Sequence, residues 1–225
     1  MNNGNLAEGS NPEKTVAAEN KALRIRFGDG NNVIASGVGN DRIAVGDGDN
    51  KIDASAGDNL VVAGDGDNTI DTGNGADRVY VGDGNNTIDA GGGANHIIAG
   101  TGDNTILAGD GDDVITIGNG NNLIDAGTGA NRVRVGHGDN QIASEAGNDR
   151  IAVGDGNNKI DASAGDNLVV AGDGDNTIDT GNGADRVYVG DGNNTVDAGG
   201  GANHIIAGFG NNWTCHAFVP PQVLV

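Results

Sequence analysis

The sequence predicts an all-β fold, a right-handed parallel β-solenoid (β-roll) with two short strands per 18-residue coil and about ten coils. The first observation is glycine, which supplies 43 of the 225 residues, whereas average usage is about 7%. The second is that the chain reads from Gly28 in nonapeptides such as GDGNNTIDA, without insertion, for 21 units. The third is that Ile or Val falls at a fixed place in every unit except the last. A fixed internal period of this kind indicates a repeat architecture.

Each nonapeptide combines a turn with a strand. The G-x-G-x-[ND] half is turn chemistry, because Gly allows positive φ and Asn and Asp bond to nearby backbone. The x-[IV]-x-[small] half alternates with period two, as a strand with one buried face does. One such strand cannot bury its apolar side alone. Coils stacked about 4.8 Å apart would bury Ile and Val between two sheets.

The residue that ends each turn separates the two edges of the predicted coil. On one edge, the Asn edge, it is always Asn, and we expect a structural ladder of Asn32, Asn50, Asn68, Asn86, Asn104, Asn122, Asn140, Asn158, Asn176 and Asn194. On the other, the mixed edge, Asp and Asn alternate from Asp41 to Asn203. Residues 18 apart are therefore expected to stack. Residues 40–99 also recur at 148–207, six coils later, as repeat proteins tolerate.

The units resemble the RTX (repeats-in-toxin, haemolysin-type) nonapeptide G-G-x-G-x-D-x-U-x, which forms a calcium-filled parallel β-roll. The unit from Ala63 to Asp71 keeps the turn glycines and the buried aliphatic residue. The first Gly is replaced, by Ala, Val, Ser, Thr or Ile, and the sixth-position Asp, the family's calcium ligand, remains in five units. The resemblance implies weak Ca²⁺ binding in the turns and no organic cofactor.

Two groups of carboxylates are the candidate calcium ligands. The first group holds the sixth-position residues Asp41, Asp77, Asp113, Asp149 and Asp185. The second lies between turn glycines and holds Asp47, Asp65, Asp83, Asp173 and Asp191. The alternative is a metal-independent solenoid, in which stacked Asn amides bond from coil to coil. In that respect the chain is similar to the N-x-V-x-G β-rolls of plant ice-binding proteins.

The outward positions of the two predicted sheets differ in character. One sheet, the Asp sheet, presents a column of Asp53, Asp71, Asp89, Asp125, Asp161, Asp179 and Asp197. The other, the Arg sheet, presents arginines among the candidate interface residues Leu60, Val62, Tyr80, Ile98, Leu168, Val170, Tyr188 and Ile206. Exposed apolar patches usually mark interfaces, so a homodimer or filament through this face is one interpretation. The other is that β-branched residues are simply good strand formers.

The ends of the solenoid need caps. The predicted domains are residues 1–27 as an N-terminal segment and cap, 28–212 as the solenoid, and 213–225 as a C-terminal cap or tail. Asn11 and Pro12 favour a helix start, so a short helix is expected over 12–22, followed by a strand over 23–27. The abrupt end also allows that the chain is a fragment.

Several function classes are disfavoured by the sequence. A net charge of −20 argues against nucleic-acid binding, which needs clustered Lys and Arg. No apolar run approaches the roughly 20 residues of a membrane span. No nucleophile or metalloenzyme motif occurs, and the G-x-G strings are repeat glycines rather than a dinucleotide fingerprint, so no catalytic residue is assigned.

Two functions remain open from the sequence. One is a non-enzymatic structural or adhesive module with weak turn-bound calcium and a partner-binding or self-associating face, secreted or on the cell surface without a cleaved N-terminal signal. The other is a calcium-independent Asn-ladder solenoid that binds an ordered surface, ice or mineral, or assembles into filaments. A row of Thr69, Thr87, Thr105, Thr177 and Thr195 favours ice, but charged Asp beside most of it counts against.

Overall fold

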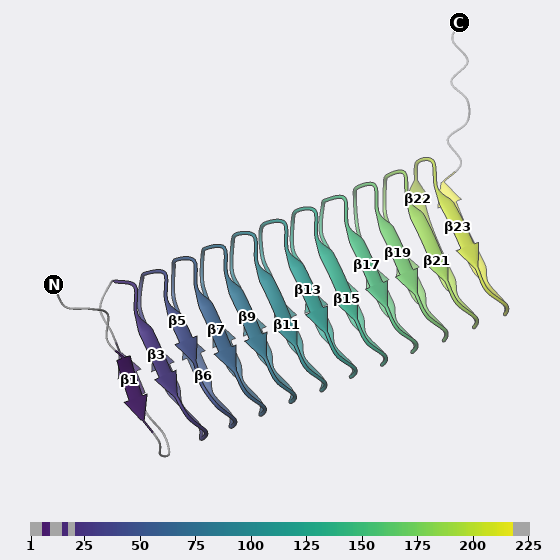
Figure 1. The fold of residues 1–225 in the computed structure, drawn as a ribbon. Helices are drawn as coiled ribbons and strands as arrows, with labels where there is room; N and C mark the ends of the chain where they lie inside the picture. The colour runs from purple at the N-terminus through teal and green to yellow at the C-terminus, as the bar shows by residue number, and fades with distance from the viewer. Residues whose placement is uncertain (1–5, 10–14, 18–20, 218–225) are drawn as a thin grey trace, which may run out of the picture.

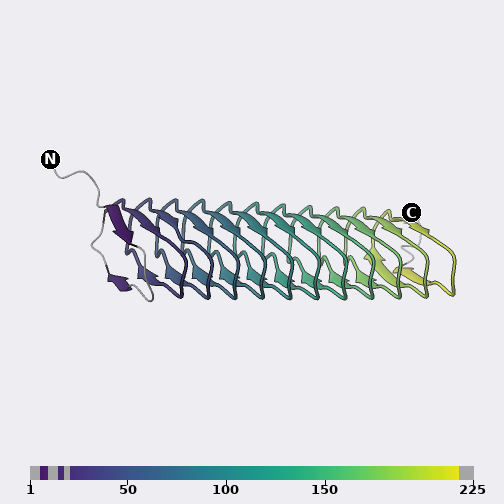
Figure 2. The same cartoon turned by 60° about the horizontal axis from the view of Figure 1, so that its bottom comes forward.

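The structure is a computed structural model that describes residues 6–9, 15–17 and 21–217. The described residues form an all-β parallel solenoid with coils of about 18 residues and two strands per coil, which confirms the predicted fold class (Figure 1). Two 12-stranded parallel sheets face each other along an elongated rod (Figure 2). The described residues include no helix long and apolar enough to cross a membrane.

The odd-numbered strands form the Arg sheet. They are β1 (Leu6–Gly9), β3 (Arg24–Phe27), β5 (Arg42–Ala44), β7 (Leu60–Ala63), β9 (Arg78–Val81), β11 (His96–Ala99), β13 (Val114–Ile117), β15 (Arg132–Val135), β17 (Arg150–Val153), β19 (Leu168–Ala171), β21 (Arg186–Val189) and β23 (His204–Ala207).

The even-numbered strands form the Asp sheet. They are β2 (Thr15–Ala17), β4 (Val33–Ala35), β6 (Lys51–Asp53), β8 (Thr69–Asp71), β10 (Thr87–Asp89), β12 (Thr105–Leu107), β14 (Leu123–Asp125), β16 (Gln141–Ala143), β18 (Lys159–Asp161), β20 (Thr177–Asp179), β22 (Thr195–Gly200) and β24 (Trp213–Ala217). Each strand pairs with the strands of the neighbouring coils at an offset of 18, for example Thr87 with Thr105.

The core is a continuous stack between the sheets. One Ile or Val per strand is almost fully buried, as Ile88 and Ile97 are at 0% exposure. The residues on either side of it point outward, and the next inward residue is also buried: it is small on the Asp sheet, as Ala90 is, and often Val or Ile on the Arg sheet, as Val81 and Ile117 are. Burial of one face of every strand is what makes each coil depend on its neighbours.

The turn glycines allow neighbouring coils to approach closely. Gly84 has φ +135°, and a Cβ there would meet the carbonyl oxygen of Gly66, one coil earlier. Its own N–H donates to Thr101 O of the next coil at 2.8 Å. Only a residue without a side chain satisfies both the positive φ and this contact.

The N-terminal segment differs from the expected helix over 12–22. Thr15–Ala17 is a strand, β2, which pairs with Val33–Ala35 of β4. The remainder of that range falls mainly outside the described residues. The physical reason is that β4 and β3 would otherwise expose unpaired backbone groups, and an added coil satisfies them. At the other end, β24 extends the Asp sheet beyond residue 212.

Candidate metal sites

The Asn edge is closed by an uninterrupted side-chain ladder. The Nδ2 of each Asn donates to the Oδ1 of the Asn 18 residues later, at 2.8–3.0 Å from Asn32 to Asn212. The same Nδ2 also reaches carbonyl oxygens of its own turn, as in Asn68 to Gly66 at 2.9 Å. The amide thus supplies donors to turn carbonyls without an ion.

The mixed edge shares only part of this pattern. Backbone N–H groups donate to the Oδ1 of the residue 18 later along the whole edge, whether that residue is Asn or Asp; Asn59 N to Asp77 Oδ1 is 2.7 Å and Asp77 N to Asn95 Oδ1 is 3.0 Å. The Nδ2 of Asn59, however, donates to Gly57 O at 2.8 Å and Thr72 O at 3.1 Å. The mixed edge therefore has a backbone ladder but no side-chain ladder.

The five Asp of the mixed edge leave one carboxylate oxygen without a partner. We call Asp41, Asp77, Asp113, Asp149 and Asp185 the Asp rungs; each is 1% exposed. In all five, Oδ2 is buried and has no hydrogen-bond donor. By equivalence with Asn59, the carbonyls near Asp77 are those of Gly75 and Ala90. An Asn amide would donate to such carbonyls, whereas a carboxylate oxygen repels them unless a cation offsets its charge.

Burial changes the ionisation of the Asp rungs. Desolvation raises the pKa of Asp113 to about 7 and that of Asp77 to about 6, partly opposed by the hydrogen bonds that the carboxylates accept from the preceding coil. Desolvation also raises the pKa of Asp41, Asp149 and Asp185. A buried, unpaired carboxylate is costly unless it is protonated or neutralised by a cation.

Further carboxylates stand beside three of the Asp rungs. The negative charges of Asp112, Asp58 and Asp166 raise the pKa of Asp113, Asp77 and Asp185 respectively. No three His, Cys, Asp or Glu side chains among the described residues converge where a metal could bind. A cation at an Asp rung would therefore need backbone carbonyl oxygens as well as carboxylate, which is the all-oxygen ligand set that Ca²⁺ accepts.

A hydroxyl accompanies four of the five Asp rungs, a correlation that the sequence reasoning missed. Five residues before the rung stand Ser36, Thr72, Ser144 and Thr180, with Ala108 as the exception, and all four hydroxyl residues are buried. The equivalent position before every Asn of the mixed edge is Ala. Hydrogen bonding from these nearby hydroxyls lowers the pKa of the four rungs, although no hydroxyl reaches Oδ2 with full hydrogen-bond geometry. The sequence contains this signal. Five residues before each Asp or Asn of the mixed edge, Ser or Thr alternates with Ala with a repeat of 36 residues, apart from Ala108.

The second group of candidate ligands lies on the Asn edge, away from the Asp rungs. Asp47, Asp65, Asp83, Asp173 and Asp191 are exposed at the turn tips. Each Oδ1 accepts a backbone N–H from the next coil, as Asp83 does from Thr101 N, which lowers its pKa. The structure thus places the two groups on opposite edges, and only the Asp rungs hold buried oxygens without donors.

The comparison with protein families decides the relationship. Seven overlapping segments match the RTX calcium-binding nonapeptide repeat: residues 28–61, 53–88, 89–124, 116–151, 145–178, 153–187 and 179–213. The chain belongs to this family. Calcium is the cofactor that membership of the RTX family implies. A search of curated proteins finds no match to the chain.

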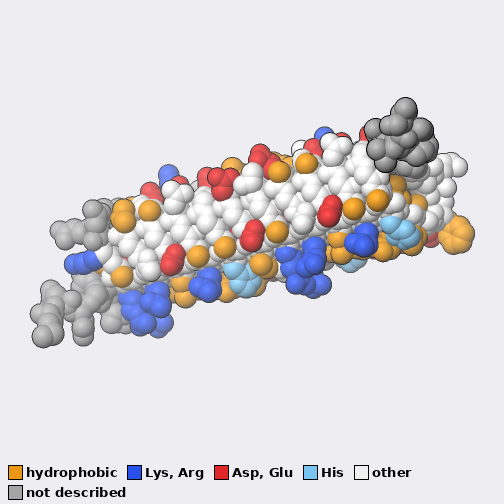
Figure 3. Space-filling view, turned by 90° about the horizontal axis from the view of Figure 1, so that it is seen from above, with side chains coloured by type: hydrophobic (Ala, Val, Ile, Leu, Met, Phe, Trp, Pro, Cys, Tyr) orange, Lys and Arg blue, Asp and Glu red, His pale blue; other side chains and the backbone are white. Residues whose placement is uncertain are grey.

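The two faces of the rod carry opposite charge. All eight arginines lie on outward positions of the Arg sheet, whereas the seven Asp of the outward column lie on the Asp sheet. Figure 3 shows most of the basic and His side chains gathered along one side of the rod, and the acidic side chains along the middle of the visible face and the opposite side. Among the candidate interface residues, Val62, Val170 and Ile206 are exposed, and Leu60, Tyr80, Ile98, Leu168 and Tyr188 are half-buried.

Proposed function

We propose that this chain is a structural calcium-binding rod in which Ca²⁺ is held at the Asp rungs of the mixed edge. The observation that carries the proposal is the set of five buried Oδ2 atoms without donors, spaced every second coil. Each would join turn carbonyl oxygens in binding the ion. When bound, Ca²⁺ would supply positive charge that offsets the buried carboxylate.

The Asn residues explain why the remaining turns need no ion. At Asn59 and along the whole Asn edge, Nδ2 donates to turn carbonyl oxygens, which are the groups that would otherwise coordinate a cation. The chain therefore replaces calcium by an amide at most turns and keeps a carboxylate at five. A site with one buried carboxylate favours weak binding, because calcium affinity rises with the number of charged ligands.

Weak sites suit a compartment rich in calcium. Extracellular modules bind Ca²⁺ at about 10⁻⁴–10⁻³ M, and RTX repeats are typical of secreted proteins. We therefore propose a secreted location in which ambient calcium keeps the rod rigid. RTX repeats are in general structural rather than enzymatic, and a structural role agrees with the absence of any assigned catalytic motif in the sequence.

Calcium titration calorimetry at neutral pH tests the proposal. The account predicts about five weak, equivalent sites per chain. Replacing all five Asp rungs by Asn would continue the amide pattern and abolish binding, because Nδ2 would occupy the place of the ion.

The matched control replaces Asp47, Asp65, Asp83, Asp173 and Asp191 by Asn, which removes the same formal charge from exposed turn tips. This variant should keep its five sites. Equal loss of binding in both variants, or no saturable binding in the unmodified chain, would rule out the Asp rungs as the calcium sites.

A binding role for the Arg sheet is a second, separate candidate. Its exposed Val62, Val170 and Ile206 beside arginines favour a partner over bare solvent. Face-to-face pairing of two copies would bring eight arginines against eight, so this face favours an acidic partner over a second copy of itself.

A further inference from the structure

The Arg sheet contains two equivalent depressions, which we call the Arg depressions. The first, of about 280 Å³, is lined by Arg24, Ile25, Arg26, Arg42, Ile43, Ala44, Leu60 and Val62. The second, of about 260 Å³, is lined by Arg132, Val133, Arg134, Arg150, Ile151, Ala152, Leu168 and Val170. Every residue of the second lies 108 positions after its counterpart in the first.

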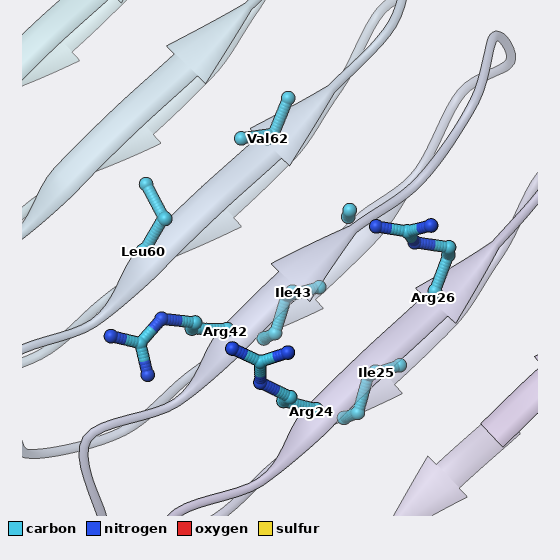
Figure 4. A pocket seen from close by; sticks show the side chains of 8 residues that line it. Arg24, Ile25, Arg26, Arg42, Ile43, Leu60 and Val62 are labelled. Carbon is cyan, nitrogen blue, oxygen red and sulfur yellow. The ribbon is translucent and has the colours of Figure 1, made fainter. Parts of the chain in front are cut away.

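The architecture of each depression follows from three adjacent strands. Figure 4 shows Arg24 and Arg26 on β3, Arg42 on β5, and Leu60 and Val62 on β7. Ala44 stands between longer side chains at the second outward position and so leaves the hollow. Arg24 and Arg42 lie at the first outward position and Arg26 at the second, so the guanidinium groups stand at both ends of the hollow, and Leu60 and Val62 form its apolar wall (Figure 4).

Among the residues that the structure describes, no arginine of either depression forms an ion pair. Arg24 pairs in register with Arg42, and Arg132 with Arg150. The paired side chains therefore leave strands that lie about 4.8 Å apart. His137 with Asp155 is the one ion pair among the described residues. The outward positions of the Arg sheet from β3 to β23 carry no Asp or Glu, but Glu8 of β1 pairs in register with Arg26, where the second depression has Thr116 beside Arg134. Three arginines without an ion pair, on an otherwise acidic rod, favour an external anion. The second depression is the clearer case, because Glu8 lies in register with Arg26 of the first. Asp58 also lines a neighbouring hollow with Arg42 of the first.

The duplication, at an offset of 108 residues, carries the arrangement as part of the repeated residues 40–99 and 148–207, and Arg24 and Arg26, before that range, also recur as Arg132 and Arg134. The first outward positions run Arg24, Arg42, Leu60, Arg78, His96, Val114 and then Arg132, Arg150, Leu168, Arg186, His204. The second outward positions run Arg26, Ala44, Val62, Tyr80, Ile98, Thr116 and then Arg134, Ala152, Val170, Tyr188, Ile206. In contrast, the turn that follows the first pair of arginines reads GDGNN at residues 28–32 and GHGDN at 136–140.

We propose that each Arg depression binds an oxyanion, a sulfate, phosphate or carboxylate group, whose apolar attachment lies against the Leu and Val wall. Guanidinium groups donate paired hydrogen bonds that match the geometry of such oxyanions. The two sites lie six coils apart, which is about 29 Å at the usual strand spacing. A linear polyanion that reaches both would bind more tightly than a single anion. This inference does not depend on the calcium proposal.

Sulfate is the probe, because it stays in solution when the buffer also contains calcium. Titration calorimetry at low ionic strength should find two equivalent sites in the unmodified chain. Arg42→Gln should leave one site, Arg150→Gln should leave one, and the double variant none. Loss of one guanidinium should weaken its own site at least about tenfold, since hydrogen bonds to charged groups are the stronger class. Binding should not change between pH 6 and 9, because Arg stays charged.

Arg78→Gln and Arg186→Gln are the matched controls. Both arginines occupy the same outward row, but their neighbours in the row are Leu and His rather than Arg. Both variants should keep two sulfate sites, and circular dichroism should show every variant folded. Absence of saturable sulfate binding, or equal loss in the controls and in Arg42→Gln, would overturn the proposal.

A second arm distinguishes a free anion from a group on a polymer. Dextran sulfate long enough to span both depressions is compared with sulfate in the unmodified chain and in Arg150→Gln. A polymer ligand predicts a gain in affinity over sulfate that is lost in the single variant. A small-anion site predicts no such gain, with the two sulfate sites retained.

Discussion

At the residue scale, the exchange of Asn for Asp decides how each turn of the mixed edge is satisfied. The two side chains have nearly the same shape, and both accept a backbone N–H through Oδ1. They differ at one atom, where Asn donates and Asp carries charge. That atom has acceptor partners at Asn59, whereas at Asp77 it has no partner.

The Asp rungs make stability depend on pH in the absence of calcium. The pKa of Asp113 is about 7 in the folded chain, whereas an unfolded Asp titrates near its ordinary value of 3.8. Between these values the unfolded chain loses a proton that the folded chain retains. Stability in EDTA should therefore fall as pH rises from about 4 to 7 and then level off. Denaturant melts at several pH values measure this.

Asp113→Asn isolates the contribution of one rung. The variant should be more stable than the unmodified chain in EDTA at pH 8, by about 1–3 kcal/mol, because no charge is buried. Its stability should also vary less with pH. The control is Asp67→Asn, which removes an exposed charge from a turn of the Asn edge. If both variants gain equally, the effect comes from net charge rather than from the buried carboxyl.

At the element scale, the turn ladders and the strand cores stabilise the solenoid in different ways. The strands bury Ile and Val, and the turns carry the hydrogen bonds that align one coil with the next. The Asn edge is uniform, so converting one of its rungs should transfer the properties of the mixed edge to it.

Asn104→Asp makes that conversion. The change removes the Nδ2 donor to Gly102 O and to Asn122 Oδ1 and introduces a buried carboxylate. The variant should unfold at a lower temperature than the unmodified chain in EDTA, and millimolar Ca²⁺ should restore a larger part of the loss than Mg²⁺ does.

The matched control for this conversion is Asn85→Asp. Asn85 is an exposed turn residue on the same edge, and its Oδ1 accepts a backbone N–H from Asp103. An Asp keeps that acceptor and places the added charge in solvent, so the control should change stability little in EDTA. A calcium response of Asn104→Asp no larger than that of Asn85→Asp would contradict the equivalence of the two edges.

The strands and turns could be predicted from the sequence because local chemistry and the nine-residue period agree. Ile88 alternates with outward residues, and Gly84 marks a turn that no other residue fits. The helix expected over 12–22 was wrong at Thr15–Ala17, since pairing with β4 outweighs the local helix-start signal of Asn11 and Pro12. Local signals do not report that an end strand needs a partner.

At the scale of the whole molecule, stacking at an offset of 18 gives a rod with two unlike faces and two unlike edges. The sequence predicted both contrasts, because each depends only on the register. It did not predict which carboxylate oxygens lack donors, nor the hollow beside Ala44, since these depend on the positions of side chains from two or three coils together. The family match to residues 28–213 agrees with the register but does not distinguish one edge from the other.

Circular dichroism during thermal unfolding, in EDTA and then in millimolar Ca²⁺ at pH 7.5, tests the central claim most directly. The claim is that Asn amides satisfy the carbonyl oxygens of most turns and that Ca²⁺ does so at the five Asp rungs. The chain should keep its β spectrum in EDTA, because the Asn ladder is intact, and calcium should raise the unfolding temperature. A disordered spectrum in EDTA would contradict the sufficiency of the ladder, and an unchanged unfolding temperature would contradict calcium at the Asp rungs.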